Sequence, residues 1–325
     1  MMSHRSQIIE LIDQGAIPRE NIEKALMTTR VVPDSTAWRI FIDNLLLWLG
    51  GLSLASSIVF FFAYNWYDMG RFAKFAIIEL LIVLTVVAYW KLGSQTVSGK
   101  MSLLVSTILL GVLLALYGQT YQTGADTWEL FFYWALLMLP WAFVGRFPAI
   151  WIVWVSLINL SIIQYYQTFR GAFRMLYSSD TELLWLLFLF NTLAMLAWEY
   201  LAKTRAWLAE RWAIRLLALG SGISITWLIL VAIFVPGGSG NSVLAVLVWL
   251  MWVAALALSY RKIWPDLFML AGVCLSVSVV ILSFLARHMI KDWSAGSFLL
   301  LAALIIGLGT AASVWLKKVH KEMHV

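Results

Sequence analysis

The sequence predicts an all-α membrane protein, a polytopic bundle of about ten transmembrane helices with a short N-terminal cytoplasmic helical hairpin. Apolar residues make up 62% of the 325 residues and charged residues 12%, against roughly half and a quarter in soluble domains. About ten apolar stretches of close to membrane-spanning length run from Asn44 to Leu316. Because too little polar surface remains to cover a water-soluble fold, lipid is the expected solvent of most of the chain.

Turn-forming residues separate the apolar stretches, as in the Pro-Gly-Gly-Ser-Gly segment at 236–240 and the Trp-Pro-Asp segment at 264–266. The expected spans are residues 44–64, 72–91, 101–118, 128–145, 148–164, 183–202, 212–235, 242–259, 264–285 and 294–316. The chain is therefore predicted to have three parts, a hairpin at 1–40, a transmembrane bundle at 41–318 and a cytoplasmic tail at 319–325.

Positive charge is divided unequally between the two sides of the predicted bundle. Sixteen Lys and Arg residues fall on the side that holds both termini, and five fall on the other side. Cytoplasmic loops carry the excess of Lys and Arg, so we expect a multi-pass protein of the bacterial inner membrane with both termini in the cytoplasm. This rule also explains the net charge of +6 better than nucleic-acid binding does. No nucleic-acid partner is expected.

The first forty residues form a separate unit. An apolar stripe from Ile8 to Ile12 stops at Gly15, a residue typical of the position after a helix end. Pro18 suits the first turn of a second helix, which is predicted to run to about Thr29. The hairpin is interpreted either as a docking or regulatory module or as an amphipathic helix pair that packs on the membrane face.

Two segments carry a resemblance to a known family. They are Leu-Ile-Asp-Gln-Gly-Ala-Ile at 11–17 and Tyr-Gly-Gln-Thr-Tyr-Gln-Thr-Gly-Ala-Asp at 117–126, with Leu130 and Leu-Pro-Trp at 139–141 downstream. The chain resembles an uncharacterised bacterial membrane-protein family, domain of unknown function 2157. In the second half, the resemblance is mainly a matching series of hydrophobic runs. It implies a polytopic bacterial inner-membrane protein and brings no catalytic residue with it.

The predicted periplasmic loop from Gly118 to Glu129 is the strongest candidate binding site. It carries no Lys or Arg and combines amides, carboxylates and aromatic rings. Such groups suit sugar hydroxyls, a lipid head group or a cation. The alternative is a tight connection whose polar side chains satisfy helix ends. The candidate ligand-binding residues are Gln119, Tyr121, Gln122, Asp126, Trp128 and Glu129.

Glu79 is the candidate intramembrane charge. It lies roughly 10 Å below the expected periplasmic end of its span, and Lys74, five residues earlier, is about 140° away around the helix. We therefore expect Glu79 to face other helices or water. It either takes part in proton or cation coupling or serves as a protonated or hydrogen-bonded packing residue.

Other polar groups lie near the ends and centres of the spans. Glu199 precedes Lys203 by four residues, a spacing that favours an interfacial pair. Arg211 and Arg215 are interpreted as positive-inside anchors. The Gly-Ser-Gly segment at 220–222 predicts either local unwinding of the kind found in transporters or a notch for close helix packing.

No catalytic, cofactor or metal-binding motif stands out, and the single residue Cys274 excludes an intrachain disulfide. We therefore expect no enzymatic activity, no cofactor and no metal. The leading hypothesis is translocation or binding of a small polar or lipid-linked molecule. The rival hypothesis is a non-transporting membrane sensor or assembly partner that acts through the N-terminal hairpin. Membrane lipids are expected partners, and a membrane-protein partner or a homo-oligomer stays open.

Overall fold

The structure is a computed structural model that describes residues 8, 11–12, 14–28, 35–64, 69–169, 181–235, 242–289 and 295–323. These ranges are helical with short connections, and no strand occurs among them. Ten helical segments within these ranges are long and apolar enough to cross a membrane. The predicted fold class, an all-α polytopic bundle of about ten spans, is confirmed.

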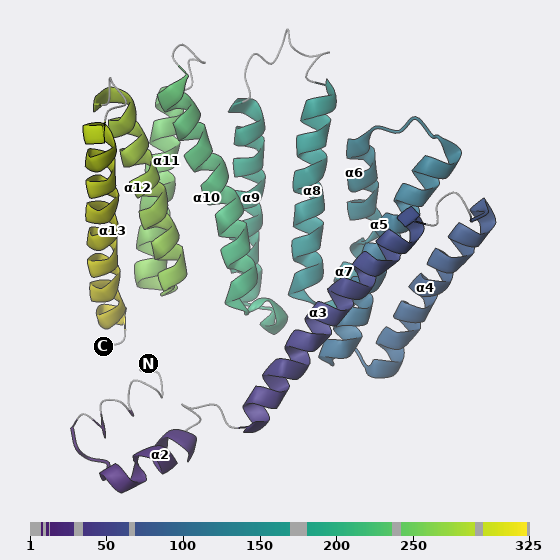
Figure 1. Cartoon of the computed structure of the whole chain (residues 1–325), viewed down its shortest axis with the longest axis horizontal. Helices are drawn as coiled ribbons and strands as arrows, with labels where there is room; N and C mark the ends of the chain where they lie inside the picture. The colour runs from purple at the N-terminus through teal and green to yellow at the C-terminus, as the bar shows by residue number, and fades with distance from the viewer. Residues whose placement is uncertain are drawn as a thin grey trace. The chain divides into compact units, whose positions relative to one another are not determined.

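The chain forms its helices in a simple order (Figure 1). The first elements are η1 (Arg19–Asn21), α2 (Ile22–Thr28), α3 (Ser35–Tyr64), α4 (Arg71–Leu92), α5 (Val97–Tyr121), α6 (Thr127–Leu137), α7 (Leu139–Gly145) and α8 (Pro148–Phe169). The later elements are α9 (Thr181–Ala202), η2 (Ala206–Leu208), α10 (Arg211–Phe234), α11 (Ser242–Leu258), η3 (Ser259–Ile263), α12 (Leu267–Met289) and α13 (Ala295–Met323).

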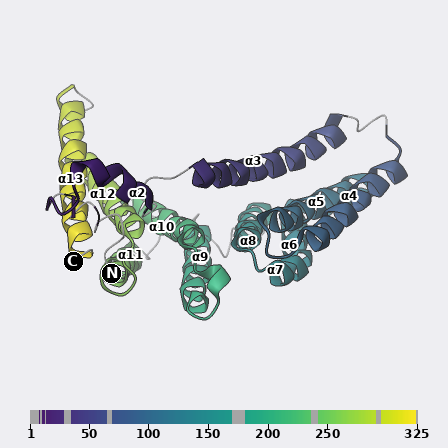
Figure 2. The same cartoon turned by 90° about the horizontal axis from the view of Figure 1, so that it is seen from below.

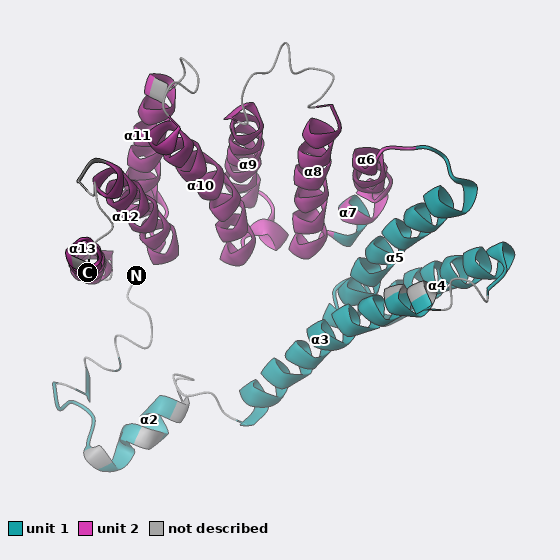
Figure 3. Cartoon of the chain, turned by 45° about the horizontal axis from the view of Figure 1, so that its top comes forward, with its two compact units in different colours: residues 1–124, 143–145, 324–325 teal, residues 125–142, 146–323 magenta. Residues whose placement is uncertain are grey.

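The chain divides into two compact units, drawn in teal and magenta in Figure 3. The first unit comprises residues 1–124, 143–145 and 324–325, and the second comprises residues 125–142 and 146–323. Each unit has a core of its own and is described by itself.

In the first unit, α5 packs against both α4 and α3. Ile78 of α4 and Leu109 of α5 are completely buried, and Val105 joins them in a small apolar core. The turn before α5 is fixed by Thr96, whose hydroxyl accepts a hydrogen bond from the Gly99 amide at 3.0 Å. A threonine in this position satisfies one of the free amides at the start of a helix.

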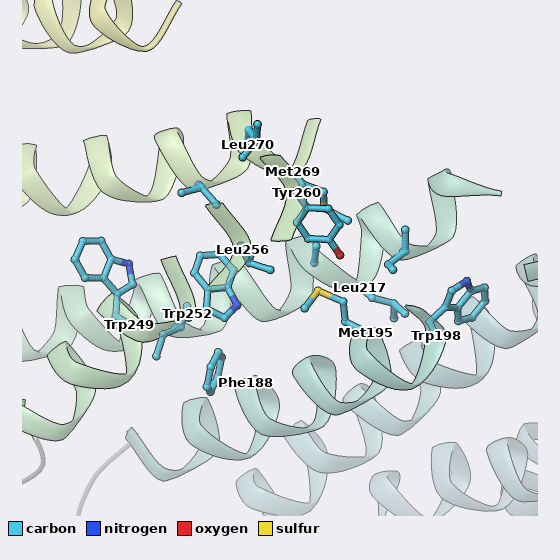
Figure 4. Packing of buried hydrophobic residues seen from close by; sticks show 14 of the residues in the cluster. Phe188, Met195, Trp198, Leu217, Trp249, Trp252, Leu256, Tyr260, Met269 and Leu270 are labelled. Carbon is cyan, nitrogen blue, oxygen red and sulfur yellow. The ribbon is translucent and has the colours of Figure 1, made fainter. Parts of the chain in front are cut away.

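In the second unit, α8 to α13 lie side by side, as Figures 1 and 2 both show. Contacts join α8 to α9, α9 to α10, α10 to both α11 and α12, and α12 to α13. Their shared core is large and rich in aromatic rings. Figure 4 shows how Met195, Leu217, Trp252, Leu256 and Tyr260 converge inside it. The second unit is therefore held together around α10.

The structure describes the predicted helix end at Gly15 of the N-terminal segment. Gly15 has φ +68°, its amide donates to Ile12 at 3.0 Å, and the Ala16 amide donates to Leu11 at 3.0 Å. These two bonds close a helix end in which the left-handed residue is a glycine. Pro18 stands directly before η1. The division of the chain into hairpin, bundle and tail stays a prediction.

The helix ends differ from the predicted span ends. α3 begins at Ser35, so it includes residue 40, where the hairpin was expected to end. No Gly or Pro interrupts residues 35–43, and a helix can therefore continue beyond its apolar part. The fourth span consists of α6 and α7, which meet at Met138. Pro140 lies in the first turn of α7, where its missing amide hydrogen breaks the regular bonding of a longer helix.

Candidate functional site

The first half of the predicted binding loop forms the end of α5. Gln119 and Tyr121 belong to the helix, and Gln122 follows it with φ +44°, donating its amide to the Gly118 carbonyl. The side chains of Gln119, Tyr121 and Gln122 are all exposed. A left-handed backbone is uncommon for a glutamine, so Gln122 holds a position that usually belongs to Gly or Asn.

The second half of the loop begins α6. Asp126 is exposed at the position before the helix, and its carboxylate makes no capping hydrogen bond. Trp128 and Glu129 are half-buried in the first turn. The Trp128 ring packs edge-on against Tyr165 of α8 with centroids 5.1 Å apart, and its carbonyl accepts from the Ser161 hydroxyl at 3.2 Å. Asp126 is therefore free of the capping role, whereas Trp128 joins α6 to α8.

The boundary between the two compact units runs between residues 124 and 125. Gln119, Tyr121 and Gln122 thus belong to the first unit, and Asp126, Trp128 and Glu129 belong to the second. A single binding site made of all six residues stays a prediction.

Glu79 lies on the exposed side of α4. The neighbouring Ile78 is buried against α5, and Lys74, one turn before Ile78, is buried on the same side of the helix. The Glu79 side chain is exposed on the surface of the first unit. Both roles expected for Glu79, in proton or cation coupling or as a packing residue, stay predictions.

The Gly-Ser-Gly segment at 220–222 is a packing notch, and the predicted alternative of local unwinding is wrong, because α10 is continuous from Arg211 to Phe234. A side-chain carbon on Gly220 would lie 2.8 Å from the Asn191 amide oxygen, and one on Gly222 would lie 3.1 Å from the Trp252 ring. The Trp252 indole donates to the Ser221 hydroxyl at 3.0 Å. Small residues let the helices approach closely here.

Asn191 also forms a reciprocal pair with Asn159 of α8. Each amide nitrogen donates to the other residue's amide oxygen, at 2.7 Å from Asn191 and 3.1 Å from Asn159. A polar amide inside the membrane needs a partner, and a second amide on a neighbouring helix supplies it here. The pair joins α8 to α9.

The main polar feature of the second unit is a cluster of Glu199, Arg211, Arg215, Tyr260 and Asp266, which we call the arginine–carboxylate cluster. Arg211 Nη1 donates to both Glu199 carboxylate oxygens, at 3.0 and 3.2 Å. The Tyr260 hydroxyl donates to Glu199 Oε1 at 2.9 Å. The Glu199 side chain is only 8% exposed, so these partners compensate for the cost of its burial.

Asp266 is the most deeply buried member of this cluster, with 2% of its side chain exposed. Its Oδ2 accepts from Arg211 Nε and from Arg215 Nε, each at 3.2 Å. Its Oδ1 accepts from Arg215 Nη2 at 3.2 Å and from the Phe268 amide at 3.0 Å. The Arg215 contact is a two-bond pairing, the strongest form of this interaction.

The sequence did not identify this cluster. It predicted a pair between Glu199 and Lys203, but Glu199 points into the bundle and binds Arg211 instead. The exposed Lys203 ammonium lies 5.1 Å from the centre of the Trp264 ring. Arg211 and Arg215 are therefore more than anchors at the membrane surface. Their spacing of four residues on α10, opposite acids at the ends of α9 and α12, is the signal that could have revealed them.

Some N–H groups of Arg211 and Arg215 make no hydrogen bond among the described residues. Arg215 uses Nε and one proton of Nη2, and its side chain is 39% exposed. Arg211 Nη2 is buried and has no hydrogen-bond partner among the described residues. An arginine has five N–H donors and no acceptor, so the partly exposed Arg215 side chain can bind a further oxygen. Within the described ranges, no group of three His, Cys, Asp or Glu residues is placed to hold a metal ion.

A groove of about 310 Å³ lies between α10 and α12. Residues on the α10 side include Leu219, Ile223, Thr226 and Leu230. Residues on the α12 side include Phe268, Gly272, Ser276 and Val279. The hydroxyls of Thr226 and Ser276 bond to each other at 2.7 Å, which satisfies these polar atoms and leaves an apolar groove.

The cluster and the groove are continuous along α10. Arg211, Arg215, Leu219 and Ile223 follow one another at intervals of four residues, which places them on one helix face. The Arg215 guanidinium also lies 5.4 Å from the centre of the Phe268 ring, which lines the groove. A charged, hydrogen-bonding end and an apolar channel therefore form one surface.

The fold defines a polytopic helical membrane protein. Within this class, residues 10–151 match the model of the family described as "Predicted membrane protein (DUF2157)", and the resemblance drawn from the sequence is confirmed over that part. The comparison with curated proteins finds no match, and the comparison with solved structures finds none. The arginine–carboxylate cluster and the groove lie after residue 151, outside the matched part.

Proposed function

We propose that this membrane protein binds a lipid-linked molecule through the side of its helix bundle, in the groove between α10 and α12. The observation that carries the proposal is the continuity of an apolar groove with a hydrogen-bonding, charged end on one face of α10. A molecule with an apolar tail and a polar head matches this surface, because the tail fits the groove and the head fits the charged end.

The size of the groove supports an acyl chain as the occupant. Its volume of about 310 Å³ is at the lower end of the roughly 300–1,000 Å³ typical of small-molecule sites. From Leu219 to Leu230, the α10 wall is about 17 Å long at 1.5 Å per residue. Half of a hydrocarbon core of about 30 Å is about 15 Å. The groove thus matches the tail of a lipid in one leaflet, which favours binding over translocation across the bilayer.

The rival function, a sensor or assembly partner that acts through the N-terminal hairpin, stays a prediction. The described part of that hairpin, around Gly15 and η1, agrees with the expected helix end but adds no feature that would identify a partner.

We also propose the bacterial inner membrane as the location, with both termini in the cytoplasm, because the Lys and Arg distribution supports it. Reporter fusions at Asp126 should then give a periplasmic signal, and fusions at Ser94 and Lys318 a cytoplasmic one. A cytoplasmic signal at Asp126 would reverse the proposed orientation.

The groove can be blocked without disturbing the backbone. A side-chain carbon on Gly272 meets no atom within 4 Å, and the same is true of Gly307 on α13, which does not line the groove. Native mass spectrometry of the purified protein should show bound lipid in the parent and in Gly307→Leu, and much less in Gly272→Leu. Both variants replace a helical glycine and gain similar helix propensity. Equal lipid retention in both variants would contradict the proposed function.

A further inference from the structure

The donors at the end of the groove indicate what kind of head group the ligand carries. Arg215 binds Asp266 with Nε and Nη2, while Nη1 makes no hydrogen bond in the described part of the chain. The Arg215 side chain is 39% exposed, so it can be reached from outside the bundle. Arg211 Nη2 is a second donor without an acceptor among the described residues.

The charges around these donors favour an anion. Within the cluster, the two guanidinium groups are balanced by the carboxylates of Glu199 and Asp266. Lys203 adds a further positive charge beside Trp264, whose ring lies 6.4 Å from that of Tyr260. An oxyanion would therefore meet the partly exposed guanidinium of Arg215, which has an unused N–H donor. Arg in particular suits the planar, two-bond recognition of phosphate or carboxylate.

The position of Arg215 connects the anion to the groove. It lies one helical turn before Leu219, which lines the groove, and its guanidinium lies over the Phe268 ring. One turn of helix is about 5.4 Å, so an acidic group attached directly to an acyl chain can reach Arg215 while the chain lies in the groove. A free anion such as inorganic phosphate would gain nothing from the groove.

We infer that the groove between α10 and α12 takes a membrane lipid with an acidic head group, and that Arg215 is the specificity-determining residue that binds this head group. The inference rests on the proposed function, since it names the chemistry of the molecule that the groove binds. Arg211 lies one helical turn before Arg215 on α10 and adds a second positive charge. Asp266 is a positioning residue, because it holds the Arg215 guanidinium against Phe268.

The experiment compares two photoactivatable lipids with identical diazirine-labelled acyl chains, phosphatidylglycerol and uncharged diacylglycerol. The full-length protein is reconstituted in phosphatidylcholine vesicles that contain a trace of one or the other, and cross-linking is measured by mass spectrometry. We expect the acidic lipid to label the parent about tenfold more strongly, as charge-assisted hydrogen bonds require. Arg215→Gln should bring the two lipids close to equal labelling, and Arg215→Lys should give an intermediate preference.

Arg261→Gln is the matched control, because Arg261 also pairs with an acid, Glu322 at 2.8 Å, but does not line the groove. It removes one arginine and one ion pair and should leave the preference unchanged. Equal labelling of the parent by both lipids would overturn the head-group assignment while the proposed function stands. Labelling of the parent by neither lipid would remove the proposed function as well. An unchanged preference in Arg215→Gln would overturn the role of Arg215, and the parent comparison decides the head group even if that variant does not fold.

Discussion

Asp266 provides the sharpest test of the packing of the second unit. Asp266→Ala removes the acceptor of three arginine hydrogen bonds and one amide hydrogen bond, in a side chain that is 2% exposed. A hydrogen bond to a charged group contributes about 1.5–3 kcal/mol. Arg211 and Arg215 are 33% and 39% exposed and recover part of their hydration when released. We therefore expect a loss of about 2–4 kcal/mol of unfolding free energy, below the sum of the separate bonds.

The matched control is Glu322→Ala, which breaks the Arg261–Glu322 pair. Both side chains of that pair are 44% exposed, and exposed pairs contribute about 0–1 kcal/mol. Equilibrium unfolding of both variants in mixed micelles with increasing SDS, followed by far-UV circular dichroism, measures the difference. A loss for Asp266→Ala no greater than that for Glu322→Ala would refute the reasoning that burial makes the cluster important.

Three further outcomes are expected. Gly220→Ala should lower the unfolding free energy by about 1–3 kcal/mol, because its new carbon would lie 2.8 Å from the Asn191 amide oxygen; an unchanged thermal midpoint would show that the notch has room. Asp126→Ala and Gln122→Ala should impair lipid or solute binding without loss of folded yield if the loop binds a ligand, whereas reduced yield alone would favour a structural loop. Glu79→Gln should leave the unfolding free energy within about 0.5 kcal/mol of the parent, as an exposed residue predicts; a large change would reveal a partner of the carboxylate.

The number and type of helices could be predicted because each span is a long apolar run. Helix ends were less predictable, since propensity extends α3 to Ser35 and α13 to Met323 beyond their apolar parts. The exposure of Glu79 depends on which side of α4 meets α5, and composition does not give this. Gly15 was predictable because a helix end that needs positive φ selects glycine locally.

The arginine–carboxylate cluster could not be predicted in the same way. Arg215 and Asp266 are 51 residues apart, and their pairing depends on α10 packing against α12. The local spacing of Glu199 and Lys203 suggested a different pair. The groove also depends on this packing, because the apolar faces of α10 and α12 form a groove only when the two helices lie next to each other. The long-range arrangement of the helices therefore supplies what the sequence pattern lacks.

The most direct test of lipid binding maps where a lipid tail touches the chain. A phospholipid with a diazirine-labelled acyl chain is cross-linked to the full protein in vesicles, and the labelled peptides are identified by mass spectrometry. Labels should concentrate at 218–230 of α10 and 268–279 of α12, disappear there in Gly272→Leu, and persist in Gly307→Leu. Labels spread evenly over the exposed faces of all helices, with no change in Gly272→Leu, would contradict a specific groove.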